Sequence, residues 1–357
     1  MQNIVSNDTV VNYFIWAYRT SNSFLFYANL TIVPFGLFFN LLSYLVFSRK
    51  TFEKGTMGFY FRVIAIMDSI ALTNLFAQFF TQSLGIDLVL VSSFTCIFFN
   101  LFLRVSFQAS AWLNVIVTLD RLACIKYVHK QFKFNKNKKI LLAILFTVLL
   151  AIILTNIPVF FLKRSVIIYN NQSLALCNTD RTSYFIREFF YMMVRTVLPF
   201  VIMLYANITL IRTLRESRLK FKKTRSMQRE YYFASSLIII NSIFLANLLP
   251  LELSKILFSA TSAQLSYFTG VITIIYFVTT YISAFNHVFP FFINLKFNKI
   301  FYNEVCNCIA EVKEFLGFSK VGVAGRNRIV SFEEGITQNG SSLVFTIQKS
   351  KLSNNVY

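Results

Sequence analysis

The stretch Trp112-Leu-Asn-Val-Ile-Val-Thr-Leu-Asp120-Arg121-Leu122 decides the fold, because it closes a long apolar segment with an acid–arginine pair. Cys96 lies at the other end of that segment, 25 residues before Arg121. A helix rises about 1.5 Å per residue, so this spacing covers about 37 Å, which is enough to cross a bilayer. The segment is therefore predicted to be one membrane-spanning helix, with the cysteine on one side and the acid–arginine pair on the other.

Composition extends this prediction to the whole chain. Of the 357 residues, 56% are hydrophobic and 14% are charged, whereas about 25% of the residues of a soluble domain are charged. A formal net charge of +20 would suit nucleic-acid binding in a soluble protein. Here the basic residues cluster between apolar segments, which is typical of membrane topology. We expect a polytopic membrane protein with no nucleic-acid partner.

Seven segments are long and apolar enough to span a membrane. They lie near residues 24–48, 58–83, 93–125, 139–162, 188–213, 231–257 and 269–293. They predict an all-α membrane protein with a seven-transmembrane helix bundle over residues 24–293. We expect residues 1–23 to be an extracellular N-terminal segment, residues 294–312 a short amphipathic helix on the membrane surface, and residues 313–357 a disordered cytoplasmic tail.

The loops predict the orientation, because basic loops stay on the cytoplasmic side. The first, third and fifth loops are rich in Lys and Arg, and the second and sixth contain neither. The N-terminus is therefore predicted outside and the C-terminus inside. Two glycosylation acceptors, Asn7 and Asn171, then fall on the extracellular side. Because this motif is common by chance, the two sites support the orientation only weakly.

Residues in successive spans resemble those of rhodopsin-class G-protein-coupled receptors, over about residues 24–312. The residues that carry the resemblance are Asn40, Asp68, Cys96, Asp120, Arg121, Pro199, Pro250 and Pro290. The resemblance implies a plasma-membrane receptor that binds an extracellular agonist and activates a heterotrimeric G protein. Membrane lipids are expected at the basic loops, and an arrestin is expected at a phosphorylated tail.

The chain also departs from the family's usual motifs. Leu248 stands two residues before Pro250, where the family usually has Trp, and Leu122 follows Arg121 in place of Tyr. The seventh-span motif reads Phe289-Pro290-Phe-Phe-Ile, without the usual Asn and Tyr. We therefore interpret the chain as a divergent member.

The resemblance assigns an activation switch to the cytoplasmic side. It implies that Arg121, next to Asp120, pairs with Glu230 and holds the inactive state. The alternative is a solvated Glu230 beside Arg229. Pro250 and Pro290 are expected to kink their helices, since proline removes a backbone hydrogen bond. The alternative is that proline is simply frequent in membrane helices.

Asp68 lies at mid-membrane depth, where an acid is costly and usually functional. The family implies an allosteric sodium ion at Asp68, Ser110 and Asn286, and no other cofactor. The alternative is a protonated Asp68 in a hydrogen-bond network.

The cysteines are predicted to have different roles on the two sides of the membrane. Cys96 and Cys177 are expected to form a disulfide, because both are predicted extracellular. Cys306 and Cys308 follow the seventh span and are candidates for palmitoylation, with free thiols as the alternative. In the amphipathic helix, Phe297, Ile300, Phe301 and Val305 are expected to face the membrane.

Four charged residues fall in the outer halves of the spans: Arg104, Arg195, Glu252 and Lys255. Each would cost about 2.5–3.5 kcal/mol if it faced lipid at the midplane, so we expect them to line a water-filled ligand site. They suit a ligand with both signs of charge, or a C-terminal amide or carboxylate. An arginine of the ligand would pair with Glu252; alternatively, Glu252 only neutralises Arg195 or Lys255.

The nature of the ligand follows from the resemblance. An amine receptor would carry Asp where this chain has Leu103, and the seventh span has no Lys for a retinal Schiff base. The chain looks most like invertebrate receptors for short amidated neuropeptides, including the FMRFamide type. The alternatives are a chemosensory receptor for a small molecule and, remotely, a transporter. No metal-ligand spacing and no nucleophile–base set is visible, so neither a metal site nor an enzyme is expected.

Overall fold

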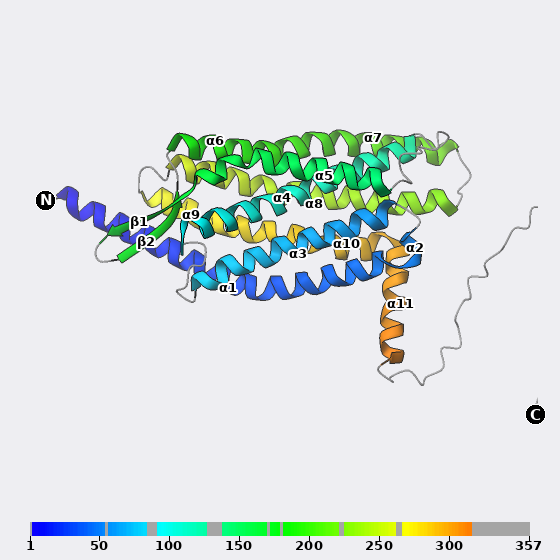
Figure 1. Ribbon diagram of the computed structural model, residues 1–357, viewed down its shortest axis with the longest axis horizontal. Helices are drawn as coiled ribbons and strands as arrows, with labels where there is room; N and C mark the ends of the chain where they lie inside the picture. Colours follow the sequence, from blue (N-terminus) through cyan, green and yellow to red (C-terminus); the bar gives the residue numbers. More distant parts are fainter. Residues whose placement is uncertain are drawn as a thin grey trace, which may run out of the picture. The chain divides into compact units, whose positions relative to one another are not determined.

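The computed structural model describes residues 2–53, 56–83, 91–126, 138–169, 172–178, 181–220, 225–261 and 266–315. The chain divides into two units, Met1–Glu311 and Val312–Tyr357, and the sites discussed below lie in the first. Seven helices are long and apolar enough to cross a membrane (Figure 1). The predicted seven-helix bundle is confirmed.

The spanning helices follow one another as expected from the sequence. They are α1 (Gln2–Phe47), α3 (Thr56–Ser83), α4 (Ser93–Lys126), α5 (Lys138–Thr155), α6 and α7 (Arg181–Met192 and Leu198–Lys220), α8 (Arg225–Thr261) and α9 (Tyr267–Ala284). Three further helices are α2 (Lys50–Glu53), α10 (Phe289–Phe297) and α11 (Lys299–Phe315). The strands β1 (Lys163–Tyr169) and β2 (Gln172–Asn178) form an antiparallel pair that the sequence analysis did not predict.

The spanning helices lie side by side, with β1 and β2 at one end and α2 and α11 at the other (Figure 1). We call these the hairpin end and the α11 end. Helix α1 packs against α3 and α9, α9 against α8, and α4 against α3, α5 and α7. At Gly36 of α1, a Cβ atom would lie 2.5 Å from Leu72 Cδ1. A larger residue at this close approach of α1 to α3 would force the buried Leu72 side chain to shift.

Aromatic and aliphatic side chains fill the interior of the bundle. The largest cluster lies near the α11 end and includes Phe47, Phe61, Phe233 and Phe301. Two further clusters are built around Leu72 and Phe107, and around Met203, Phe244 and Leu248. Without a hydrophobic force between lipid-facing helices, this packing and the buried polar contacts hold the bundle together.

Helix α1 begins earlier than the boundary at residue 24 that the sequence suggested. Its apolar span already starts at Thr9. The ring of Tyr13 lies 5.3 Å from that of Tyr267 at the start of α9, and Tyr18 meets Phe277 edge-on at 5.8 Å. These contacts hold the first part of α1 against α9. The helix therefore continues into residues 1–23, where it depends on a packing partner that hydropathy alone does not register.

Helix α11 differs from the expected surface helix in the direction of its apolar face. Phe301 and Val305 are buried in the core at the α11 end, and the Phe301 ring lies 4.8 Å from that of Phe47. The expectation that these two side chains face the membrane was wrong, because they pack onto the bundle instead. Asn298 begins the helix, since its side-chain oxygen accepts from the backbone N–H groups of Ile300 and Phe301, each at 3.2 Å.

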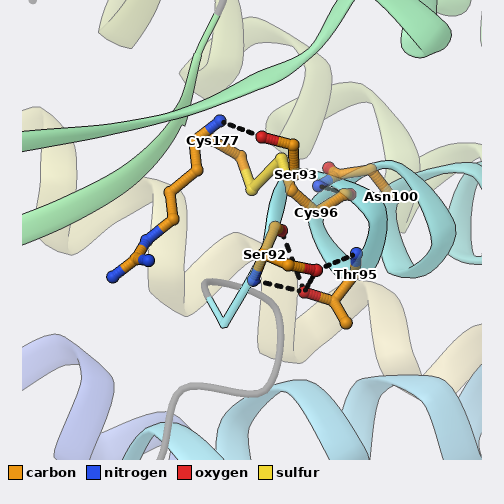
Figure 2. The surroundings of a disulfide bond; sticks show 7 residues. Ser92, Ser93, Thr95, Cys96, Asn100 and Cys177 are labelled. Carbon is orange, nitrogen blue, oxygen red and sulfur yellow. Dashed lines mark hydrogen bonds between the residues drawn. A yellow bond between two sulfur atoms is a disulfide. The ribbon is translucent and has the colours of Figure 1, made fainter.

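A disulfide joins Cys96, near the start of α4, to Cys177 in β2, with their Cα atoms 5.8 Å apart (Figure 2). The predicted pairing is confirmed. Ser92 and Thr95 cap the start of α4 reciprocally, because each side-chain oxygen accepts from the other residue's backbone N–H. Asn171 and the side chain of Asn7, the two glycosylation candidates, lie outside the described residues, as does the tail from residue 316.

Candidate functional site

The four charged residues predicted for the ligand site come together inside the bundle toward the hairpin end. Arg195 lies in a π-helical turn, Met193–Val197, between α6 and α7. Its Nη1 atom is 3.3 Å from Glu252 Oε1 of α8, and both side chains are buried. Lys255, one turn further along α8, places Nζ 3.7 Å from the same oxygen. One carboxylate oxygen therefore contacts two cations.

A second carboxylate holds Arg104, and the sequence analysis did not assign it to the site. Glu188 of α6 forms an ion pair with Arg104 of α4, and its Oε1 atom is also 3.0 Å from Arg187 Nη2. The available signal in the sequence was its position, because Glu188 is the first residue of the predicted span 188–213. Glu188 lies seven residues before Arg195, a spacing that puts the two side chains on one helix face.

Tyr191 lies at the centre of these charges, and the sequence analysis also missed it. Its ring centroid is 4.4 Å from Arg104 Cζ, 4.8 Å from Lys255 Nζ and 5.4 Å from Arg195 Cζ. The ring is buried, and its face attracts cations through its quadrupole. We define the outer cluster as Arg104, Glu188, Tyr191, Arg195, Glu252 and Lys255.

The outer cluster carries an excess of positive charge among its described side chains. Arg104, Arg195 and Lys255 face two carboxylates, those of Glu188 and Glu252. Arg187 adds a further cation at Glu188. Arg195 Nε is buried and has no hydrogen-bond acceptor within the described parts of the chain. Leaving a buried donor unsatisfied costs about 1–3 kcal/mol, so an acceptor supplied from outside would be stabilised here.

Deeper in the bundle, Asp68 of α3 has two side-chain partners on other helices. Its Oδ1 atom accepts from Ser110 Oγ of α4 at 2.8 Å and lies 2.7 Å from His287 Nδ1. All three side chains are buried. The contact of Asp68 with Ser110 was predicted, and its contact with His287 was not. The sequence did hold a signal for His287, because it is an ionisable residue within an apolar span.

Asn286, the third predicted sodium ligand, takes part in a different set of contacts. Its side-chain oxygen accepts from Asn247 Nδ2 at 2.8 Å, and its Nδ2 atom donates to the Phe244 carbonyl at 3.4 Å. The structure therefore brings Ser110 and Asp68 together, whereas the recorded hydrogen bonds of Asn286 connect it to α8.

The helix break before Pro290 positions His287. Residues Phe285–His287 form a single 3-10 turn, and α10 restarts at Phe289 with Pro290 in its first turn. Proline tolerates this position because its missing N–H is not needed there. Asn40 Nδ2 of α1 donates to the His287 carbonyl at 3.0 Å. This bond satisfies a backbone group that the break leaves free in the membrane.

Near the α11 end, Arg121 is held by its neighbour and by α3. Its Nη2 atom is 2.5 Å from Asp120 Oδ2 and 2.8 Å from Thr56 Oγ1. Thr56 Oγ1 in turn donates to Asp120 Oδ2 at 3.0 Å. Thr56 begins α3 and was not singled out in the sequence. The side chain of Glu230 lies outside the described residues, so the Arg121–Glu230 pair remains a prediction.

Arg49, between α1 and α2, connects to the side chains of α11. Its guanidinium contacts Glu304 at 2.7 Å, Glu311 at 2.6 Å and Cys308 Sγ at 3.1 Å. The hydrogen bond with Glu311 raises the pKa of Arg49 and lowers the pKa of Glu311. Cys308 is thus half-buried beside Arg49, whereas Cys306 is exposed. The two lipidation candidates have different surroundings.

Comparison with known proteins agrees with this architecture. The family profile described as "7 transmembrane receptor (rhodopsin family)" matches residues 39–290. The match runs from α1 into α10 and includes the outer cluster, Asp68 and Arg121. No curated protein matches the chain.

Proposed function

Because the chain belongs to the rhodopsin family of seven-transmembrane receptors, we propose that its agonist is a short amidated peptide bound at the outer cluster. Membership of the family makes it a multi-pass plasma-membrane receptor that responds to an extracellular ligand and signals through a heterotrimeric G protein. Such receptors are generally not enzymes. The identity of the ligand class is the proposed step.

The observation that carries the proposal is the environment of Arg195. Its guanidinium is buried, shares Glu252 with Lys255, and keeps Nε without an acceptor within the described residues. The carbonyl oxygen of a C-terminal amide is a hydrogen-bond acceptor of the required kind. Tyr191 and Phe107 both lie next to Arg195, with their rings 5.4 Å and 4.5 Å from its Cζ atom, and help to hold the guanidinium in place.

The orientation in the membrane is part of the proposal. We place the hairpin end outside, which puts the Cys96–Cys177 disulfide in an oxidising compartment. The predicted basic loops then lie at the α11 end, in agreement with the usual distribution of positive charge. On this orientation the ligand reaches the outer cluster from the extracellular side. Arg121 lies at the cytoplasmic side, together with the proposed lipid and arrestin contacts.

Agonist binding would act through differential affinity for two conformations of the bundle. The outer cluster is built from α4, α6, the π-helical turn Met193–Val197 and α8, so a ligand that contacts it touches several helices at once. Pro250 lies within α8, two residues before Glu252. A proline at this point leaves a backbone carbonyl without its helical partner and makes a hinge. Movement of α8 about that hinge would alter the cytoplasmic side near Arg121.

The proposal is tested by measuring G-protein activation in cells that express the chain, against a panel of short amidated peptides. The expected result is a saturable response at submicromolar concentration. Arg195→Gln should shift the response to higher concentrations, whereas Arg62→Gln, a change outside the outer cluster, should not.

Silence across the panel, with surface expression confirmed and several G proteins supplied, would count against a peptide agonist. A response to a small molecule that is lost in Arg195→Gln would move the assignment to a chemosensory receptor of the same family. Either result leaves family membership unchanged.

A further inference from the structure

Receptors of this fold are expected to hold a sodium ion at the acid of the second spanning helix, which is Asp68 here. We propose that His287 takes the place of that ion, so that this receptor does not bind sodium at Asp68. The imidazole of the chain itself then provides the positive or hydrogen-bonding partner that the carboxylate requires. The inference concerns the bundle interior and does not depend on which ligand is bound at the outer cluster.

The carboxylate of Asp68 already has two protein partners. Asp68 Oδ1 lies 2.8 Å from Ser110 Oγ and 2.7 Å from His287 Nδ1. Both distances are ordinary hydrogen-bond lengths, so two protein groups share Oδ1 of the carboxylate. A hard cation prefers oxygen ligands, and an imidazole nitrogen is a poor substitute for one. His287 therefore contributes a partner to Asp68 but not a ligand to sodium.

The other residues predicted to bind sodium already have protein partners. The side-chain oxygen of Asn286 already accepts from Asn247 Nδ2 at 2.8 Å. The backbone oxygen of Ser110 accepts from Asn114 Nδ2 at 3.1 Å. With the imidazole on Asp68 Oδ1 and these oxygens turned to protein donors, the residues around Asp68 do not present a convergent set of oxygens to an ion while His287 is in place. The residues present do not fit the ion.

Several independent contacts fix His287 in place. The break before α10 puts His287 in a 3-10 turn, and Asn40 binds its carbonyl oxygen at 3.0 Å. Its ring stacks on Phe107 of α4, with centroids 5.0 Å apart and planes inclined by 12°. Contacts with α1, α3 and α4 thus define one position for the imidazole. Such fixation is typical of a structural partner for a buried carboxylate.

The consequence concerns regulation. When a dissociable sodium ion binds the inactive state, the population of that state rises with the sodium concentration by mass action. A histidine that belongs to the chain is always present, so this dependence is absent. The stability of this receptor should then be indifferent to sodium beyond the general effect of salt.

The test uses the purified full-length chain in detergent and follows thermal unfolding without any ligand. Sodium chloride is exchanged for choline chloride at a constant ionic strength of about 0.15 M. We expect the melting temperature of the wild-type chain to be the same in both salts. In His287→Asn, which releases Asp68 Oδ1, we expect a saturable, sodium-specific rise in melting temperature. The double variant with Asp68→Asn should lose that rise.

Two outcomes would overturn the proposal. One is a saturable sodium-specific stabilisation of the wild-type chain. The other is a folded His287→Asn variant, monodisperse on size exclusion, that remains indifferent to sodium. If His287→Asn does not fold, His287→Ser provides the same release of Asp68 with a smaller side chain. The wild-type measurement alone can still contradict the inference.

Discussion

The phenyl ring of Phe107 lies against the imidazole of His287, with centroids 5.0 Å apart and an angle of 12° between the planes. The same ring lies 4.5 Å from Arg195 Cζ. One side chain of α4 therefore contacts both the outer cluster and the partner of Asp68. It provides a direct contact between the proposed ligand site and the bundle interior.

Replacing Phe107 should destabilise the bundle strongly. Phe107 is buried, and truncation of a buried Phe to Ala typically costs about 3–5 kcal/mol through lost contacts and a residual cavity. We expect Phe107→Ala to lower the melting temperature of the purified receptor, and Phe107→Leu to lower it less. Phe102→Ala is the control, because Phe102 lies on the same helix but is exposed. Equal shifts for Phe102→Ala and Phe107→Ala would contradict this packing role.

Thr56→Val should raise signalling in the absence of agonist. The substitution keeps the size of the side chain but removes the hydroxyl that accepts from Arg121 and donates to Asp120. Loss of these bonds weakens the contact of Arg121 with α3, which we propose belongs to the inactive state, by about 1 kcal/mol or more, which corresponds to a severalfold change in population. The measurement is basal G-protein activation at equal surface expression.

The matched control for that experiment is Thr147→Val, which removes an exposed hydroxyl on α5. It should leave basal activity unchanged. Glu230→Ala should also raise basal activity if Glu230 holds Arg121, as the sequence predicts. Unchanged basal activity in Thr56→Val would show that the Thr56 hydroxyl does not restrain Arg121.

Arg49→Met should loosen α11. The substitution keeps an apolar stem but removes the contacts with Glu304 and Glu311. Hydrogen–deuterium exchange at the backbone amides of α11 should become faster. Lys50→Met changes an exposed neighbouring cation and should have little effect. If α11 exchanges at the wild-type rate in Arg49→Met, packing of Phe301 and Val305 alone holds the helix.

Acidification should have the same effect as Arg49→Met in the wild-type chain. The bond to Arg49 lowers the pKa of Glu311, so its contribution is present above the ordinary pKa of a glutamate. The contribution is lost as the pH falls through the lowered pKa, where the carboxylate takes up a proton. Protection of the α11 amides, the intrinsic exchange rate of an unfolded chain relative to the observed rate at the same pH, should therefore fall at acid pH in the wild type, and by less in Arg49→Met, which has already lost the pair.

Removal of the disulfide should destabilise the hairpin end. Cys96 and Cys177 are 81 residues apart in the chain, and loss of a native disulfide typically costs about 2–5 kcal/mol. Cys96→Ala, Cys177→Ala and the double variant should lower the melting temperature by similar amounts, because each removes the same bond. Cys124→Ala, at a cysteine outside the disulfide, is the control. Additive shifts in the double variant would argue against a shared bond.

Glu252→Gln distinguishes two ways in which a peptide could use the outer cluster. If an arginine of the agonist pairs with Glu252, agonists with arginine should lose at least tenfold more potency than matched agonists without it. If Glu252 only neutralises Arg195 and Lys255, both kinds of agonist should lose potency equally. Glu188→Gln is the matched control, since it removes the other carboxylate of the cluster and should not discriminate between the two agonists.

Several features of the protein could be predicted from the sequence because each depends on a local property. The seven spans follow from the length of the apolar segments, since a residue partitions into the bilayer according to its own polarity. The positions of Arg104, Arg195, Glu252 and Lys255 indicated a buried site, because a charge facing lipid is costly. The early start of α1 and the direction of the apolar face of α11 were missed, because both depend on a packing partner.

The sequence by itself determined that the chain is a seven-helix membrane protein with charges buried in its interior. The tertiary structure alone decided the partners of those charges: Glu188 for Arg104, Thr56 for Arg121 and His287 for Asp68. The physical reason is that each pair joins different helices, separated by 65 to 219 positions in the chain. Contacts over such separations depend on how the helices pack, and hydropathy and local spacing do not contain that information.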